Sequence, residues 1–337
     1  MKVCLYSEGM KEMEFFSLSG ITVAFKNFQT ALKRAGIKYT MNIFDDFDIL
    51  HLNQPLGLKS PLYSGYFKNR GKKIVVHGHT VPEDFKESFM ASNDIYPVLK
   101  KIFPSFYKYA DVAMCPSPYA AKILRKHLGK RKRIEVVSNG VDIKKYRHSE
   151  TKRRKYRKKE KIGDKTLVIS VGHVIKRKGC EDFAKIAIDM KDQEFRWFGT
   201  IYPPFMVRYT EIEKYVKKPP KNLKFTGFFK DIIMAYSAAD ILLFPSKVET
   251  QGIVILEAAA MGKPIIVRDI PAYEGWLFHG KNCLKAKNNR EFKKYIRLIE
   301  KDSKLRKKLS TNALKLAREN SLENIGKRLK EIYESLM

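Results

Sequence analysis

Cysteine is scarce in this chain, and the four cysteines lie far apart. The 337 residues contain only Cys4, Cys115, Cys180 and Cys283. None belongs to a C-x-x-C pair or to a histidine-paired spacing, which argues for reduced thiols in a cytosolic compartment and against a zinc site. No run approaches 18 uncharged apolar residues, and residues 1–8 are typical of a first strand rather than a signal peptide. We therefore expect neither a disulfide scaffold nor a membrane-spanning protein.

Acidic residues are also scarce relative to basic ones. There are 36 Asp and Glu against 67 Lys and Arg, a net charge of +31. Such a surplus indicates an anionic partner: nucleotide phosphate, nucleic acid or an acidic lipid surface. Residues 144–165 hold twelve basic and three acidic residues. We interpret them as a charged linker plus helix, which either binds anionic phospholipid at about 1 kcal/mol per basic residue or forms a solvated hinge.

Short apolar runs alternate with helical patterns along most of the chain. The length exceeds what one core usually supports, so two domains of about 150 residues are the default. Strands are expected at Val3–Tyr6, Ile49–Leu52, Ile74–Val76, Val112–Cys115, Ile134–Val137, Leu167–Val171, Phe195–Phe198, Leu223–Phe225, Ile241–Phe244 and Ile265–Val267. This alternation predicts an α/β fold with two doubly wound parallel sheets, and the residues beyond Glu291 predict helices. The expected division is 1–143, a linker at 144–165, 166–320, and a final helix at 321–337 that crosses back to the first domain.

The most informative stretch is Glu249–Glu257, where two carboxylates bracket a glycine and an apolar run. A helix that begins near Gly252 leaves the first backbone N–H groups without intrahelical partners, and these groups and the helix dipole favour phosphate. A carboxylate suits the paired hydroxyls of a ribose or hexose. The pattern predicts a sugar-nucleotide site. Alternatively, Glu249 is a helix-start acid and Glu257 a solvated surface residue.

Three further blocks accompany this motif: Val171–Gly179 after a strand, Ser138–Asp142 at the domain junction, and the Pro245–Ser246 turn. With them, the chain resembles the retaining nucleotide-sugar glycosyltransferases of the two-domain GT-B type, the E-x7-E (family 4) group. The resemblance covers nearly the whole chain. It implies two Rossmann-like domains facing across a cleft, with helices at the carboxyl end.

Three more segments narrow the resemblance. They are similar to the corresponding segments of bacterial diacylglycerol glucosyltransferases: His77–Thr80 followed by Glu83–Phe85, the strand end Trp197–Gly199, and Val267–Leu277. This implies a UDP-activated glucose or related hexose as donor and a lipid acceptor, diacylglycerol or its monoglucosyl derivative. It also implies a cytoplasmic enzyme attached peripherally to the anionic inner face of the membrane. No cofactor is obligatory, with Mg²⁺ as an optional stimulant, and no nucleic acid takes part.

The resemblance assigns the donor site residue by residue. Glu257 would hold the ribose hydroxyls. Glu249, together with the amides of Gly252, Ile253 and Val254, would hold the hexose and its distal phosphate. The family reacts by front-face substitution, in which a diphosphate oxygen receives the proton of the acceptor.

Lys178 would neutralise the leaving diphosphate, because negative charge develops on it in the transition state. The resemblance also makes Gly172 a donor-binding residue. The family places an arginine directly after this glycine, whereas this chain has His173. Either Arg177 or Lys176 supplies the second positive charge, or Lys178 acts with backbone amides alone. The alternative for this basic run is a solvated cluster at a helix start.

In the first half, His79 matches the family histidine that faces the donor sugar. It lies just past a buried strand, where ligand-facing loops are found. His77 is the rival assignment, and a structural role is open for either histidine. Gly20 opens the helix that includes Ala24 and Phe28, and the family uses a small residue there so that amides approach phosphate or acceptor. A simple turn would look the same.

Basic and aromatic residues interleave over residues 96–109, as they do in interfacial anchors. A core helix with snorkelling lysines explains that pattern equally well. Two other functions stay open: a glycosyltransferase with a soluble acceptor, and a basic nucleic-acid-binding protein, which leaves the paired glutamates unexplained.

Overall fold

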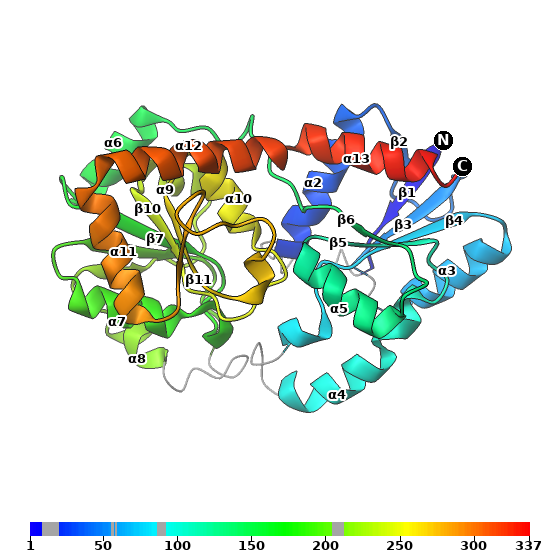
Figure 1. Ribbon diagram of the computed structural model, residues 1–337, viewed down its shortest axis with the longest axis horizontal. Helices are drawn as coiled ribbons and strands as arrows, with labels where there is room; N and C mark the ends of the chain where they lie inside the picture. The colour runs from blue at the N-terminus through cyan, green and yellow to red at the C-terminus, as the bar shows by residue number, and fades with distance from the viewer. Residues whose placement is uncertain (9–19, 55–56, 58, 86–91, 204–211) are drawn as a thin grey trace.

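Two six-stranded sheets organise the chain, and every neighbouring strand pair in them is parallel (Figure 1). The computed structural model describes residues 1–8, 20–54, 57, 59–85, 92–203 and 212–337. The first sheet has the order β2-β1-β3-β4-β5-β6 and the second the order β12-β11-β10-β7-β8-β9. The strands are β1 Lys2–Tyr6, β2 Lys38–Thr40, β3 Ile49–Asn53, β4 Lys73–His77, β5 Val112–Cys115, β6 Ile134–Val136, β7 Leu167–Val171, β8 Glu194–Phe198, β9 Leu223–Phe225, β10 Ile241–Phe244, β11 Ile265–Arg268 and β12 Leu284–Ala286.

The predicted α/β fold with two parallel sheets is confirmed. All ten expected strands are present, with bounds that agree within one residue. Two strands were not predicted. β2 (KYT) and β12 (LKA) each have three residues at the edge of a sheet, and neither has a large apolar residue on both sides of a polar one, the signal that the edge strands β6 and β9 carry.

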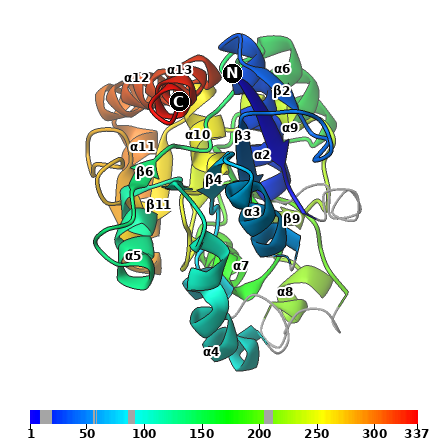
Figure 2. The same ribbon diagram turned by 90° about the vertical axis from the view of Figure 1, so that its right-hand side faces the viewer.

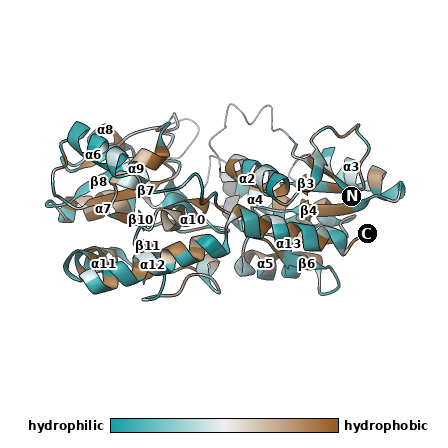
Figure 3. Cartoon of the chain, turned by 90° about the horizontal axis from the view of Figure 1, so that it is seen from above, coloured by the Kyte–Doolittle hydropathy of each residue, from teal (hydrophilic) through white to brown (hydrophobic). Residues whose placement is uncertain are grey.

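Helices cover both faces of each sheet, as parallel strands require. In the first half they are α2 Gly20–Arg34, α3 Lys59–Asn69, α4 Ser92–Ile102 and α5 Pro118–Leu128; in the second half they are α6 Glu150–Lys159, α7 Cys180–Asp189, α8 Glu213–Lys217, α9 Ile232–Ala238, α10 Ile253–Ala260, α11 Asn289–Lys301 and α12 Ser303–Glu319, followed by α13 Leu322–Glu334. Figure 3 shows apolar strands between helices whose outer faces are polar. Among the described residues, no helix has the length and apolar character needed to cross a membrane.

The last helix returns to the first sheet. α12 and α13 lie end to end across both halves (Figures 1 and 3), and α13 packs against α2 (Figure 2). Leu322, Ile325 and Leu329 join the apolar cluster of Phe28. α12 packs on the second half and α13, which follows it directly, packs on the first half. The two helices therefore connect the halves.

The basic segment 144–165 contains α6, which packs against α9 of the second half. Tyr156 of α6 is 2% exposed and joins the core beneath it. In the same helix, Arg153 and Arg157 form ion pairs with Asp240 at 2.7 and 3.1 Å. Part of the positive charge in this segment is therefore neutralised within the protein.

Candidate active site

Helix α10 is apolar on all sides except for Glu257, which is only 6% exposed. A helix without a polar face belongs in a core, so a carboxylate within it requires partners. Tyr146 donates to one carboxylate oxygen at 2.5 Å and Tyr236 to the other at 2.8 Å. Burial raises the pKa of Glu257, while the two tyrosine hydroxyls oppose that shift. Each carboxylate oxygen keeps a second lone pair, so the group can still accept from a ligand hydroxyl.

The amino end of α10 has no side-chain cap. Gly252 caps the helix with φ +87° and has no side chain to bind the first amides. Ile253 and Val254 follow as the first two helical residues. The predicted helix start near Gly252 is confirmed. The binding of a phosphate by the first N–H groups and the helix dipole stays a prediction.

Glu249 lies in the loop before α10 and is 6% exposed. Its Oε1 accepts from Ser246 at 2.6 Å and forms an ion pair with Lys178. Burial alone would raise the pKa of Glu249. The neighbouring Lys178 and Arg177 charges and the two hydrogen bonds outweigh burial and bring the pKa below its usual value. The carboxylate is therefore ionised at neutral pH.

The loop after β7 brings Lys178 to this position through close backbone packing. At Gly199, φ is +154° and an added Cβ would lie 1.9 Å from the carbonyl oxygen of Gly172. At Gly179, φ is +77° and a Cβ would lie 2.3 Å from the carbonyl oxygen of Pro245. Both positions require glycine, because a side chain would collide with backbone. The loop is thus pressed against the ends of β8 and β10.

The structure shows where His173, which replaces the family arginine, and the two candidates for the second positive charge, Arg177 and Lys176, lie. Burial, followed by the Lys178 and Arg177 charges, lowers the pKa of His173 to about 4, and the ring stacks on Tyr202. It is neutral at pH 7. Arg177 is half-buried beside Glu249 and donates to the carbonyl of Val248 at 3.2 Å. Lys176 is exposed, so Arg177 is the cation placed next to the loop.

His79 is 6% exposed and held on both sides. Its Nδ1 lies 2.6 Å from Oδ1 of Asn139 and its Nε2 lies 2.7 Å from Oδ1 of Asn53, while its backbone N–H donates to Gln54 at 2.9 Å. Burial lowers its pKa to about 4, against the opposing effect of the Asn139 bond. A neutral ring donates from one nitrogen only, so one asparagine must present its amide nitrogen. A sugar hydroxyl could reach the ring only by replacing one of these partners.

His77 lies deeper than His79. It is fully buried, and its ring stacks on that of His79 with centroids 4.3 Å apart. Neither of its ring nitrogens has a hydrogen-bond partner in the described part of the chain. Of the two rival histidines, His79 is the one near the surface of the site.

Several hydrogen bonds between the two halves of the chain involve the loop that carries Glu249. Ser117 donates to the carbonyl of Thr250 at 2.6 Å. Gln251 accepts from the backbone N–H of Asn139 at 3.0 Å and donates to Ser138 at 2.8 Å. Since Asn139 also binds His79, a continuous set of hydrogen bonds joins the loop of Glu249 to the first sheet. The site is therefore assembled from both halves.

The remaining predicted residue, Gly20, is the first residue of α2 and is exposed. A Cβ there would meet open space, so the protein's own packing does not require glycine at this position. Its proposed role toward phosphate or acceptor stays a prediction.

Sequence reasoning missed the side chains that hold the predicted ones. Tyr146 and Tyr236 reach Glu257 from segments far along the chain and show no local motif. Asn139 lies within the Ser138–Asp142 block that supported the resemblance. That block was the one sequence feature that could have marked Asn139 as a site residue. Among the described residues, no group of three His, Cys, Asp or Glu side chains is arranged to hold a metal ion.

Comparisons with known proteins agree with this architecture. Residues 19–145 match the model "Glycosyltransferase Family 4" and residues 152–316 match "Glycosyl transferases group 1". The chain is 33% identical over 342 residues to the processive diacylglycerol alpha-glucosyltransferase of Acholeplasma laidlawii, covering 100% of this chain and 99% of that protein. It is 26% identical to the alpha-galactosylglucosyldiacylglycerol synthase of Streptococcus pneumoniae, over 94% of this chain and 85% of the relative.

A solved structure shares the fold over its full length. The Anabaena HepE protein, crystallised with UDP and glucose, superposes with a TM-score of 0.80 at 17% identity, covering 99% of this chain and 100% of the other. At that identity, the match concerns the fold alone. Together with the full-length relative, it leads to one assignment: this chain belongs to the GT-B glycosyltransferases built from a family 4-type domain and a group 1 domain.

Proposed function

We propose that this protein transfers a hexose from UDP-hexose, with glucose as the expected sugar, to diacylglycerol or monoglucosyl-diacylglycerol, with retention of the anomeric configuration. The observation that carries the proposal is the full-length similarity to a processive diacylglycerol glucosyltransferase. The arrangement of Lys178, Glu249 and the uncapped amino end of α10 supports a nucleotide-sugar donor.

In this proposal the nucleotide sugar lies along the loop and α10. Glu257 would accept from the ribose hydroxyls, and its two tyrosine partners would keep the carboxylate in place. The amides of Gly252, Ile253 and Val254 would face the distal phosphate. Glu249 would accept from the hexose hydroxyls, since its pKa is held low and it remains an acceptor at neutral pH.

The transfer step exchanges one bond for another at the anomeric carbon. The acceptor hydroxyl oxygen forms the new bond on the face from which the diphosphate leaves, and a diphosphate oxygen takes the acceptor proton. Lys178 and Arg177 would stabilise the negative charge that develops on the leaving group, which is where preorganised charge is most effective. The neutral ring of His79 would exchange a partner and bind a sugar hydroxyl. No metal has a required part, and Mg²⁺ would act at most as a stimulant.

The membrane-facing element of the proposal is α4, which lies at the outer margin of the first half (Figures 1 and 2). Ile95, Val98 and Ile102 are 50%, 59% and 42% exposed, and Lys100 and Lys101 lie in the last turn. Exposed apolar residues beside lysines suit the interface of an anionic bilayer. The exposure of these residues favours an interfacial helix over a core helix, and we propose peripheral attachment to the inner face of the cell membrane.

The test is UDP release from UDP-glucose by purified protein, with diacylglycerol or monoglucosyl-diacylglycerol in mixed micelles that contain anionic lipid. We expect lipid-dependent release that is lost in Glu257→Gln and kept in Glu319→Gln, a matched change at an exposed position of α12. Release should persist in EDTA. Urea unfolding midpoints confirm that both variants are folded.

Two outcomes would contradict parts of the proposal. Release with a soluble acceptor and with neither lipid would keep the donor site and refute the lipid acceptor. Equal activity of Glu257→Gln and wild type would refute the assigned nucleotide position.

A further inference from the structure

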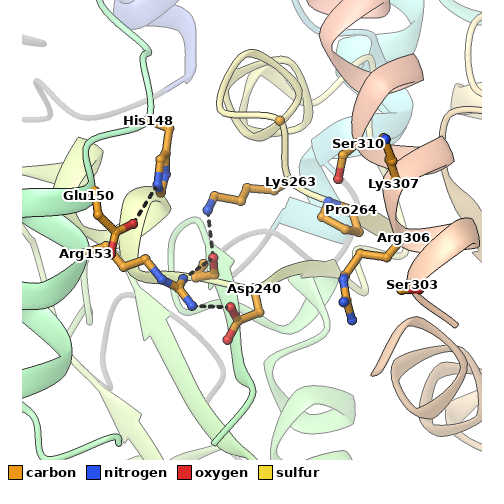
Figure 4. A pocket seen from close by; sticks show the side chains of 12 residues that line it. His148, Glu150, Arg153, Asp240, Lys263, Pro264, Ser303, Arg306, Lys307 and Ser310 are labelled. Atoms are coloured by element: carbon orange, nitrogen blue, oxygen red, sulfur yellow. Dashed lines mark hydrogen bonds and ion pairs between the residues drawn. The ribbon is translucent and has the colours of Figure 1, made fainter. Parts of the chain in front are cut away.

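A cavity lies at the opposite edge of the second sheet from Glu249. It has a volume of about 500 Å³. Asp240 and Pro264, which line it, directly precede β10 and β11, so the cavity is at the amino ends of these strands, whereas α10 begins beyond the carboxyl end of β10. Figure 4 shows α6 residues on one side and α12 residues on the other. This place is separate from the donor site proposed above.

Positive charge predominates in the lining. The basic side chains are Arg153, Lys263, Arg306 and Lys307, against the two acids Glu150 and Asp240. Both acids already have partners within the protein. Asp240 pairs with Arg153 at 2.7 Å, and Glu150 lies 3.4 Å from His148. The cavity therefore has a surplus of about two positive charges that these acids do not neutralise.

Lys263 is the most unusual group in this lining, because it is only 7% exposed. Its Nζ donates to the carbonyls of Ser237 at 3.2 Å and Ala239 at 2.8 Å. Burial, and then the charge of Arg153, lowers its pKa to about 8. Asp240 and Glu150 attract this ammonium electrostatically, which raises its pKa and opposes part of that shift. A buried ammonium is costly, and an anion in the cavity would relieve that cost.

Helix α12 presents further donors to the same space. Ser303, Arg306, Lys307 and Ser310 are spaced so that they lie on one face of the helix, and all four line the cavity. Arg306 donates to the carbonyl of Ile299 at 3.1 Å, which holds its guanidinium in place. Hydroxyl, guanidinium and ammonium donors around one space match the oxygens of a phosphate group.

We propose that this cavity is a binding site for a phosphomonoester. At neutral pH such a group carries close to two negative charges, which matches the surplus of the lining. Lys263 lies at the inner wall, with Lys307 and Arg306 on α12. The phosphate can come from a small soluble compound or from the headgroup of an anionic lipid, and the chemistry of the site accepts either source.

The experiment is calorimetric titration of the full-length protein, without nucleotide sugar and at constant ionic strength. The probes are inorganic phosphate, glycerol 3-phosphate, and phosphatidylcholine vesicles with and without phosphatidic acid. We expect saturable binding of at least one phosphate probe, weakened about tenfold or more in Lys307→Glu. Lys308→Glu, the same charge change at the adjacent exposed position, should bind like wild type.

The outcomes separate the sources and the alternatives. Binding of the soluble phosphates supports a small-molecule ligand, and binding of phosphatidic acid vesicles alone supports a headgroup. Absence of saturable binding for every probe overturns the proposal. Equal weakening in the two lysine variants also overturns it, because that result indicates only the general positive field. Urea midpoints for both variants confirm folding, and no donor-site residue is changed, so the result is independent of the proposed transferase activity.

Discussion

Removing the ion pair between Lys178 and Glu249 should affect stability and catalysis differently. The side chains are 13% and 7% exposed, so each charge depends on the other. Lys178→Met leaves the buried carboxylate without its main partner. The double variant Lys178→Met/Glu249→Gln removes both charges and keeps similar volumes.

The expected stability changes follow from burial. Removing one partner of a buried pair costs about 3–5 kcal/mol, while replacing both is often close to neutral. Ser246 still donates to Glu249, and the Arg177 charge remains nearby. We therefore expect the single variant to lose about 3 kcal/mol and the double variant to return to within about 1 kcal/mol of wild type.

The expected activity does not follow stability. If Lys178 stabilises the leaving diphosphate, its loss should lower turnover about 10²–10³-fold, as for other preorganised groups that face developing charge. Both variants should show this loss, since neither restores the cation. Urea unfolding measures the first effect, and single-turnover UDP release measures the second. Lys176→Met, at an exposed position of the same basic run, is the control for general charge.

One result would refute the reasoning. If the double variant regained turnover together with stability, Lys178 would act only as a structural partner of Glu249. If Lys178→Met were as stable as wild type, the buried Glu249 carboxylate would not depend on the Lys178 charge for its stability.

Three further predictions concern other parts of the structure. Gly199→Ala should destabilise the protein by at least about 3 kcal/mol, because its Cβ would lie 1.9 Å from a backbone carbonyl oxygen. Gly163→Ala, which also has a positive φ but has open space around it, should cost only about 1–2 kcal/mol. Thermal unfolding of the two variants measures the difference. Val98→Asp should weaken sedimentation with anionic vesicles, while Phe44→Asp, at an 88% exposed apolar residue outside α4, should not. The pKa of His79 is lowered from 6.5 to about 4, so the imidazole binds a proton at higher pH in the unfolded chain than in the folded protein. The free energy of unfolding should therefore fall as the pH drops from about 6.5 to about 4. His79→Gln should show a smaller change than wild type between the urea midpoints measured at about pH 7 and pH 5.

Much of the fold could be predicted because its signals are local. Buried parallel strands require continuous apolar runs, and β3, β5 and β10 are buried along their whole length. β2 (KYT) and β12 (LKA) were missed because they lack the two large apolar residues that flank the polar residue in the equally short edge strands β6 (IEV) and β9 (LKF). The helices beyond Glu291 were predicted because their apolar residues repeat with helical spacing.

The site was predictable only in part, for the same reason. Glu249, Gly252 and Glu257 occupy one short segment, where loop, glycine and helix start can be read together. The partners Tyr146 and Tyr236 lie 111 and 21 residues from Glu257, and no local pattern connects them to it.

The amino-acid sequence by itself determined the two sheets, the glycine-ended loops and the segment that carries both glutamates, because each depends on residues close together in the chain. Tertiary structure alone decided which cation stands beside Glu249, that burial lowers the pKa of His173, and that Lys263 is buried against backbone carbonyls. These properties depend on burial and on distances between segments far apart in the chain, and a sequence pattern contains neither.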